Sequence, residues 1–326
     1  MRAFVVSETN GQLSCDVREV EPLPVDDDDV LVKVEYSGVN FKDVMVASAP
    51  SRVRRRATLV GGVDAAGVVA RSPDSDLSPG TAVAVHGGNL GVGRDGGFAP
   101  FVFASRRQLS VLPPTVSTRE AMIIGTAGFT AMASVLALED EGLQPGAQVL
   151  VTGATGGVGS HAVTYLALRG YAPVASTGWP EATSWLLDRG AVRVVGRSEL
   201  SDRPDRTLGS ELWDGAIDCV GGETLHQVLR SLRYGSAVAA CGVMAGGDLS
   251  TTIYPFITRA VTLVGVDAVE ASDATRQRVW RALGELAPRV DFASLIDRVI
   301  TLEGVAGALE DVRAGTTRGR VLVQLD

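Results

Sequence analysis

The sequence has few of the residues that form disulfides or bind structural metals. Only three cysteines and three histidines occur in 326 residues, and three cysteines cannot build a disulfide scaffold. The cysteines stand far apart, with no C-x-x-C pair and no histidine at zinc-ligand spacing. The sequence therefore predicts neither a disulfide-rich fold nor structural zinc, and we expect no metal at the functional site.

Basic charge and long apolar runs are also scarce. The formal net charge is −8, and nucleic-acid binders normally carry a basic face. No apolar run reaches the length of about 18 residues that a membrane span needs. The first residues also lack the apolar core of a signal peptide. We therefore expect no nucleic-acid partner and no membrane partner, and we predict a cytoplasmic protein.

What the sequence does have is enough apolar material for two domains. Short apolar runs between glycine and proline turns fill the first third and predict a β-rich domain. After about residue 118, apolar strands alternate with helices, which is typical of a parallel, doubly wound sheet. We predict an α/β protein whose β-rich domain covers residues 1–118 and 259–326, with a dinucleotide-binding domain at 119–258.

The strongest local motif is a glycine-rich turn. Residues 149–160 read Val-Leu-Val-Thr-Gly-Ala-Thr-Gly-Gly-Val-Gly-Ser, so that an apolar strand enters the turn and a helix leaves it. Glycines let the backbone approach a pyrophosphate, and the amino end of the helix attracts its charge. A tight structural turn is the alternative, but the strand–turn–helix context favours a dinucleotide site.

The end of the next strand indicates which dinucleotide binds. Residues 175–180 read Ala-Ser-Thr-Gly-Trp-Pro, and no acidic residue occurs before Glu181. An NAD site usually carries Asp or Glu here, on the ribose hydroxyls. Small hydroxyl side chains instead leave room for a 2′-phosphate and can donate hydrogen bonds to it. The sequence thus predicts NADP, with Arg197 either a phosphate ligand or an ordinary surface arginine.

Seven segments together carry a family pattern. They are residues 40–43, 62–67, 125–132, 137–140, 151–160, 213–218 and 239–242. In combination they resemble the quinone-oxidoreductase branch of the medium-chain dehydrogenase/reductase superfamily, and within it the acrylyl-CoA reductase-like subfamily. The resemblance runs essentially from end to end of the chain.

The resemblance implies a GroES-like first domain and a Rossmann second domain. It also implies a zinc-free enzyme, usually a homodimer, that uses NADPH to reduce an activated carbon–carbon double bond. The implied substrate is a small molecule, an α,β-unsaturated acyl-CoA thioester such as acrylyl-CoA. Three alternatives stay open: an NADPH quinone reductase, an enoyl reductase of secondary metabolism, and a non-catalytic NADPH-binding sensor.

Carried over position by position, the resemblance also implies site residues. The pyrophosphate turn corresponds to Thr155, Gly156, Gly157, Val158 and Gly159. The grip on the 2′-phosphate corresponds to Ser176, Thr177, Gly178, Trp179 and Arg197. The nicotinamide side corresponds to Thr126, Thr130, Gly242 and Val243. The catalytic positions correspond to Asn40, Phe41 and Thr126.

Two residues depart from the family pattern. Phe41 stands where the family typically has tyrosine, so no hydroxyl is available there to deliver a proton. Trp179 stands where the family often has arginine, which removes a charge-assisted phosphate contact. Trp179 either stacks on the adenine or forms an apolar cap.

Several polar residues have both a functional and a structural interpretation. Lys42 and Asp43 are either catalytic or shape the loop that carries them. His86 either contacts substrate or hydrogen-bonds its own loop. The basic cluster of Arg52, Arg54, Arg55 and Arg56 either holds the phosphates of CoA or is a solvated loop.

Overall fold

The computed structural model describes residues 1–21, 26–200 and 206–325. The chain divides into two compact units, Met1–Phe129 with Ala268–Asp326, and Thr130–Asp267. The observed boundaries therefore fall at 129/130 and 267/268. Both predicted boundaries, 118/119 and 258/259, lie earlier in the chain. Two elements account for the difference: helix α2 (Thr118–Asp140) continues from one unit into the other, and strand β14 (Thr262–Gly265) joins the sheet of the second unit.

The first unit is built on two sheets. The smaller has the order β2 (Gln12–Glu19), β1 (Arg2–Thr9), β4 (Thr58–Val60). The larger has the order β15 (Ile296–Ile300), β16 (Arg320–Gln324), β3 (Val30–Val39), β5 (Asp64–Arg71), β6 (Ala82–His86), β8 (Leu109–Val111), and β7 (Phe101–Ala104) pairs with β3. Its helices are α1 (Phe41–Val46), α7 (Asp273–Leu286) and α8 (Val305–Ala314).

Strand β3 shows why this unit forms sheets. Val30, Val32 and Val34 are buried, and Lys33 between them is exposed, which is the alternation of a strand with one face on a core. The antiparallel pairing of β3 with β16 brings a segment near residue 320 beside Val39. The last strand of the chain therefore completes the sheet of the first unit.

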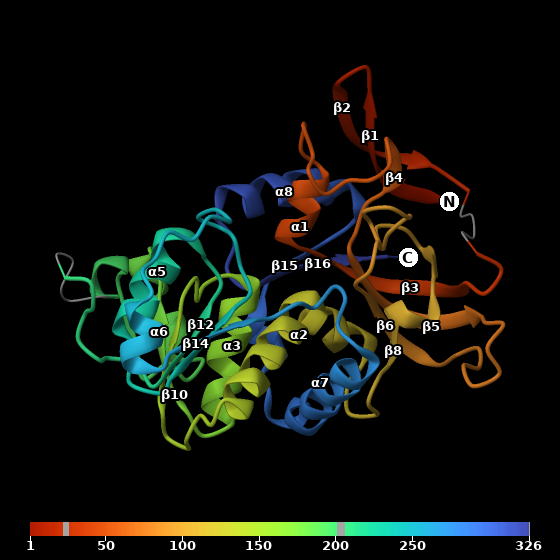
Figure 1. Cartoon of the computed structure of the whole chain (residues 1–326). Coiled ribbons are helices and arrows are strands. Elements are labelled where there is room, and N and C mark those ends of the chain that lie inside the picture. The colour runs from red at the N-terminus through yellow and green to blue at the C-terminus, as the bar shows by residue number, and fades with distance from the viewer. Residues whose placement is uncertain (22–25, 201–205, 326) are drawn as a thin grey trace. The chain divides into compact units, whose positions relative to one another are not determined.

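The second unit contains a six-stranded sheet in which every pairing is parallel. Its order is β11 (Arg193–Val195), β10 (Ala172–Ser176), β9 (Gln148–Val151), β12 (Gly215–Asp218), β13 (Ala237–Ala240), β14. In chain order this is 3-2-1-4-5-6, the Rossmann arrangement. Helices α3 (Gly157–Leu168), α4 (Thr183–Leu187), α5 (Gly222–Ser231) and α6 (Tyr254–Arg259) connect these strands (Figure 1).

The sequence pattern placed the strand near residues 261–266 with the β-rich domain, and this was wrong. Thr262 to Gly265 pair in parallel with Ala237 to Ala240, so the segment is the sixth strand of the Rossmann sheet. An apolar run of this length fits either kind of sheet. Only its pairing decides which unit it joins.

Helix α2 is the one described helix that is long and apolar enough to cross a membrane. Most of its apolar stretch, 83%, is buried inside the protein, as in the core helix of a soluble protein. The helix is kinked at Gly125, where φ is +48° and ψ is −161°.

Candidate active site

The pyrophosphate turn lies between β9 and α3 of the second unit. Gly156 is the N-cap of α3, and the first turn of this twelve-residue helix contains no acidic residue. A methyl group on Gly159 would lie 2.3 Å from the carbonyl oxygen of Gly153, so the helix comes too close to the turn for any side chain. Glycines and unshielded helical N–H groups at this position fit the pyrophosphate of a dinucleotide.

The residues predicted to grip a 2′-phosphate come together at the end of β10. The side chains of Ser176 and Thr177 lie at the strand end, and Thr177 Oγ1 accepts the N–H of Trp179 at 3.1 Å. The guanidinium of Arg197 lies across Gly178: a methyl group there would be 2.9 Å from its Nη2. The cation of Arg197 and the hydroxyl of Thr177 thus lie at the same turn, directly after Ser176, and this combination fits an anionic group. Trp179 is half-buried beside them.

Strands β9 and β12 are sheet neighbours at the point where the strand order reverses. Ligands of open α/β sheets bind outside the carboxyl ends of the strands at such a switch point. Thr152 donates its hydroxyl to Asp218 Oδ1 at 2.6 Å, and the N–H of Gly221 donates to Oδ2 at 2.7 Å. Burial raises the pKa of Asp218. These bonds fix the two strand ends that flank the nucleotide turn.

The loop of Gly242 and Val243 follows β13 and lies against the end of β12. A methyl group on Gly242 would be 1.9 Å from the carbonyl oxygen of Cys219, so the two backbones are in direct contact. Val243 is exposed. Both residues therefore lie at the same sheet edge as the pyrophosphate turn.

In the first unit, Asn40 and Asp43 shape the start of α1. Asp43 Oδ2 accepts the N–H of Asn40 at 2.8 Å, and its Oδ1 accepts the N–H of Val63 at 2.9 Å. The structure thus gives Asp43 the loop-shaping role that was one of its two interpretations. Burial, followed by the charge of Asp64, raises the pKa of Asp43 to about 7.

A buried arginine connects these residues to α2. Arg320 Nη1 donates to Asn40 Oδ1 at 2.8 Å and to the carbonyl of Val39 at 3.2 Å, and its Nε donates to the carbonyl of Ile123 at 3.2 Å. Its Nη2 lies 3.4 Å from Asp64 Oδ2. Arg320 is 2% exposed and Asp64 is 0% exposed, so this ion pair is shielded from water.

Asp64 also holds the kink of α2. Its Oδ2 accepts the N–H of Thr126 at 2.9 Å. Burial raises the pKa of Asp64, and the positive charge of Arg320 opposes that rise. Thr126 and Thr130 follow the kink four residues apart and so share one helix face. Asn40 and Thr126, two of the predicted site residues, are therefore held by one buried network in which Arg320 and Asp64 are central.

Comparison with known proteins identifies the family. The alcohol dehydrogenase GroES-like domain matches residues 26–114, and the zinc-binding dehydrogenase family matches residues 157–285. YhfP from Bacillus subtilis, classed by name with the quinone oxidoreductases, is 40% identical over 99% of this chain and 98% of its own. The chain belongs to the medium-chain dehydrogenase/reductase superfamily. The predicted family and the predicted pair of folds are confirmed.

Further relatives place the protein in the quinone oxidoreductase and AcuI-like branch of that superfamily. Acrylyl-CoA reductase AcuI from Ruegeria pomeroyi is 39% identical over 98% of this chain and 97% of its own. The yhdH oxidoreductase from Salmonella enterica, solved in complex with NADP, has a TM-score of 0.95 at 37% identity, with 100% of each chain covered. The structure of Bacillus subtilis yhfP with NAD bound has a TM-score of 0.95 at 40% identity, with 99% of each chain covered.

Two residues of this medium-chain dehydrogenase/reductase were missed by sequence reasoning, Arg320 and Asp64. Asp64 lies within the segment 62–67 of the family pattern, but nothing in that segment indicates an ion pair. Arg320 begins the last strand, and only the pairing of β16 with β3 brings it to Asn40. No local signal in the sequence could have found this contact.

Sequence reasoning also missed the proximity of Cys219 and Cys241. Their sulfur atoms lie 3.9 Å apart, although 22 residues separate them along the chain. A signal was present, because each follows an apolar strand directly and the two strands are consecutive. Cysteines at the same end of neighbouring parallel strands meet.

The other predicted residues have varied surroundings. Phe41 is half-buried at the first position of α1. His86 is buried, with its ring 4.7 Å from that of Phe129 and Arg276 Nη1 3.3 Å from its Nε2. Burial, followed by the charge of Arg276, lowers its pKa to about 3. A buried neutral histidine fits a structural role.

The four arginines of the basic cluster divide into two kinds. The side chain of Arg54 is 4% exposed, pairs with Glu8 and donates to the carbonyl of Val46 at 2.6 Å. Arg56 is exposed and lies 3.6 Å from Asp95. Arg52 and Arg55 are exposed. Arg54 is therefore part of the fold, and the pair of Arg52 and Arg55 is the part of the cluster that can meet a solvent-borne anion.

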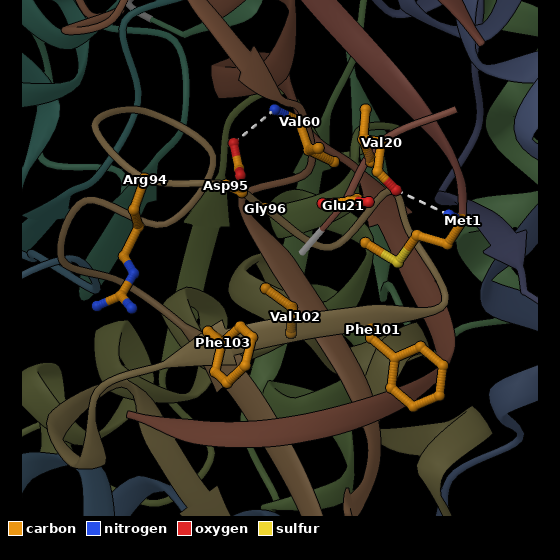
Figure 2. Close-up of a pocket in the computed structure, with 10 residues that line it drawn as sticks. All are labelled: Met1, Val20, Glu21, Val60, Arg94, Asp95, Gly96, Phe101, Val102 and Phe103. Carbon is orange, nitrogen blue, oxygen red and sulfur yellow. Dashed lines mark hydrogen bonds between the residues drawn. The ribbon is translucent and has the colours of Figure 1, made fainter. Parts of the chain in front are cut away.

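A small hollow of the first unit contains none of the predicted site residues. Met1, Val20, Phe101 and Phe103 line it beside Arg94 and Asp95, with room for about one water molecule (Figure 2). One dashed line joins Asp95 to the N–H of Val60, a hydrogen bond of 2.9 Å. In residues 1–21, 26–200 and 206–325, no three His, Cys, Asp or Glu side chains gather as a metal-binding group.

Proposed function

We propose that the protein uses NADPH to reduce the activated carbon–carbon double bond of an α,β-unsaturated acyl-CoA thioester. The observation that carries the choice of cofactor is the position of Arg197 across Gly178, in the turn that directly follows Ser176 and Thr177. This arrangement suits the 2′-phosphate that distinguishes NADPH from NADH. The choice of acceptor is supported by the likeness to AcuI over 98% of the chain.

Within this proposal, the second unit binds and orients the cofactor. NADPH, when bound, supplies a hydride to the β-carbon of the acceptor. The amino end of α3, at residues 155–159, holds the pyrophosphate through backbone N–H groups, so no side chain there needs to be charged. Gly242, Val243 and Thr130 are the proposed neighbours of the nicotinamide. Correct positioning is a large part of what such a site contributes to rate.

Within the same proposal, residues of the first unit act on the acceptor. Negative charge develops on the thioester oxygen as the β-carbon is reduced, and positioned donors stabilise it. Asn40 is a positioning residue, because its amide is committed to the network of Arg320. Phe41 offers an aromatic surface and no proton. Water is therefore the proposed proton source for the α-carbon. A positioned general acid typically accelerates proton transfer by about 10²–10⁴-fold, and Phe41 cannot supply that acceleration.

A quinone reductase is the second candidate, and the 40% identity to YhfP favours it. An enoyl reductase of secondary metabolism and a non-catalytic NADPH sensor are further alternatives. The test follows NADPH oxidation in parallel with acrylyl-CoA, crotonyl-CoA and a quinone. We expect kcat/KM to be at least about tenfold higher for acrylyl-CoA than for the quinone, a difference of about 1.4 kcal/mol in transition-state binding.

The outcomes of this test separate the candidates. A quinone reduced faster than either thioester contradicts the acyl-CoA proposal. Tight NADPH binding with no oxidation by any acceptor identifies a sensor. NADH replacing NADPH without loss contradicts the proposed role of Arg197.

We also propose that the enzyme is a cytoplasmic homodimer joined at the edge of its Rossmann sheet. In the described part of the chain, β14 has a strand neighbour on one side only, and Leu263, Tyr254 and Ile257 are exposed near it. An unpaired edge with apolar side chains favours association with a second copy. Light scattering should give twice the chain mass, and Leu263→Lys should shift it toward the monomer; a monomeric wild-type protein contradicts the proposal.

A further inference from the structure

We propose that Cys219 and Cys241 are a thiol pair that closes reversibly to a disulfide when a low-molecular-weight disulfide, such as oxidised glutathione, accepts two electrons from them. The pair lies at the carboxyl ends of β12 and β13. It would be a modification site beside the proposed nucleotide site. The formation of the bridge rests on the thiol geometry alone. Its effect on NADPH rests on the proposed function.

The geometry needs only a small movement. The sulfur atoms are 3.9 Å apart, and a disulfide bond is about 2.05 Å long. The two cysteines follow directly after Asp218 and Ala240, which are partners in the parallel ladder, and the N–H of Cys241 donates to the carbonyl of Asp218 at 2.9 Å. The two backbones are therefore held side by side, and side-chain rotation at the strand ends can close most of the gap.

The surroundings indicate which thiol reacts first. The hydrogen bond with Cys241, then burial, then the charges of Cys241 and Asp218 raise the pKa of Cys219. Cys219 is therefore a weak first nucleophile. Cys219 and Cys241 are both partly exposed, and the loop after Cys241 continues through Gly242 to the exposed Val243. We assign the first attack to Cys241.

The reaction balances in two exchanges. The sulfur of Cys241, having lost its proton, attacks one sulfur of oxidised glutathione, whose disulfide bond breaks and releases one reduced glutathione. The sulfur of Cys219 then loses its proton, attacks Cys241 Sγ of the mixed disulfide and releases a second reduced glutathione. The cysteines are oxidised by two electrons and glutathione disulfide is reduced by the same two. A dithiol reagent reduces the bridge, restores both cysteine thiols and is itself oxidised to its disulfide.

The bridge would act on the loop after β13. Drawing Cys241 toward Cys219 also moves Gly242, which already contacts the carbonyl group of Cys219. Gly242 and Val243 are proposed neighbours of the nicotinamide. We therefore expect bridging to weaken NADPH binding by at least about tenfold. By reciprocity, saturating NADPH slows bridging.

The three cysteines can be distinguished by tryptic peptides, because Cys15, Cys219 and Cys241 fall in residues 3–18, 207–230 and 234–259. The intact protein is incubated with oxidised glutathione, and thiols are titrated after denaturation. We expect three thiols to fall to one, and peptides 207–230 and 234–259 to be joined with the loss of two hydrogens. The matched control is Cys15→Ser, in which two thiols should fall to none.

Specific results overturn the proposal. A titre that stays at three, a bridge that includes Cys15, or bridging between two protein molecules each contradicts it. Cys219→Ser should abolish the joined peptides and leave Cys241 only as a glutathione adduct. A bridged protein that binds NADPH as tightly as the reduced protein overturns the coupling to the loop. If the reduced protein does not bind NADPH, the proposed function is contradicted. That result does not bear on whether Cys219 and Cys241 form the bridge.

Discussion

Asp64 accepts the backbone N–H of Thr126 at 2.9 Å, across 62 residues of sequence. The bond ties the kinked start of α2 to strand β5. At the kink, Gly125 has a φ of +48°, and a methyl group there would lie 2.6 Å from Arg320 Nη2 and 2.7 Å from Asp64 Oδ2, so only glycine fits without strain. A substitution at Gly125 therefore tests directly how much the ion pair of Arg320 and Asp64 contributes to stability.

Gly125→Ala should destabilise the protein by more than about 3 kcal/mol, because it combines a positive φ with a clash against a buried ion pair. Gly142→Ala is the matched control: its φ is +87° and nothing lies within 4 Å of the added methyl. That control should cost only about 1–2 kcal/mol for the backbone conformation. Urea unfolding measures the free energy of unfolding of both variants. Equal losses in Gly125→Ala and Gly142→Ala would show that Arg320 and Asp64 can shift to accommodate the methyl group.

Arg197→Ala should raise the dissociation constant of NADPH by about 10–100-fold and leave that of NADH nearly unchanged. The loss corresponds to one charged hydrogen bond of about 1.5–3 kcal/mol. Arg193→Ala, at an exposed arginine on the same strand-and-turn segment, is the control. Fluorescence titration measures both cofactors. A parallel loss for NADH would mean that Arg197 supports the fold instead of the phosphate.

The nucleotide half of the proposed site could be predicted because its signals are local. The turn after β9 and the end of β10 each show their chemistry within about ten residues of sequence, and a strand–turn–helix pattern limits what they can form. The unit boundaries could not be predicted in the same way. The kink at Gly125 and the pairing of β14 depend on contacts that hydrophobic periodicity does not describe.

The acceptor half could be predicted only in part. Asn40, Phe41 and Thr126 follow from the family pattern, but the ion pair that holds two of them joins residues 64 and 320. Register between β16 and β3 sets that contact, and one residue of slip would turn Arg320 to the other face. Such information exists only in the folded chain.

Asp43→Asn should flatten the dependence of stability on pH. The pKa of Asp43 is raised to about 7, whereas an unfolded aspartate titrates near about 3.9. The folded state thus binds the proton more tightly: its contribution is complete below about pH 4 and is lost as the pH rises through about 7. Wild-type protein should lose up to about 1.4 kcal/mol more per pH unit than the variant over this window.

Urea unfolding at pH 5, 6, 7 and 8 measures this difference, with the exposed Asp248→Asn as control. Parallel curves for wild type and Asp43→Asn would show that Asp43 ionises alike in the folded and unfolded chain.

Replacing Arg52 and Arg55 together by glutamate should raise KM for an acyl-CoA thioester by about tenfold or more, because charge-assisted phosphate contacts are lost. An acyl-pantetheine substrate, which lacks those phosphates, should be unaffected. Arg54 is left unchanged because its side chain is buried against Glu8. Arg107→Glu, at an exposed arginine elsewhere in the first unit, is the control. Equal KM values for all variants would assign the cluster to a solvated loop.

Phe41→Tyr should increase kcat for acyl-CoA reduction by about tenfold or more if position 41 is on the proton route, since a placed acid accelerates protonation. The solvent isotope effect on kcat should change with it. Phe41→Leu removes the ring and should raise KM without changing that isotope effect. An unchanged rate in Phe41→Tyr would place the proton route elsewhere.

The pairing of β16 with β3 has a consequence during synthesis. Residues 1–129 leave the ribosome first, yet their buried carboxylate Asp64 meets the guanidinium of Arg320 only when the last strand is made. Until then, burying Asp64 without its cation is costly. The nascent first unit is therefore held back from completing its core, and a polypeptide that stops short of residue 320 should be a preferred target for chaperones and proteases.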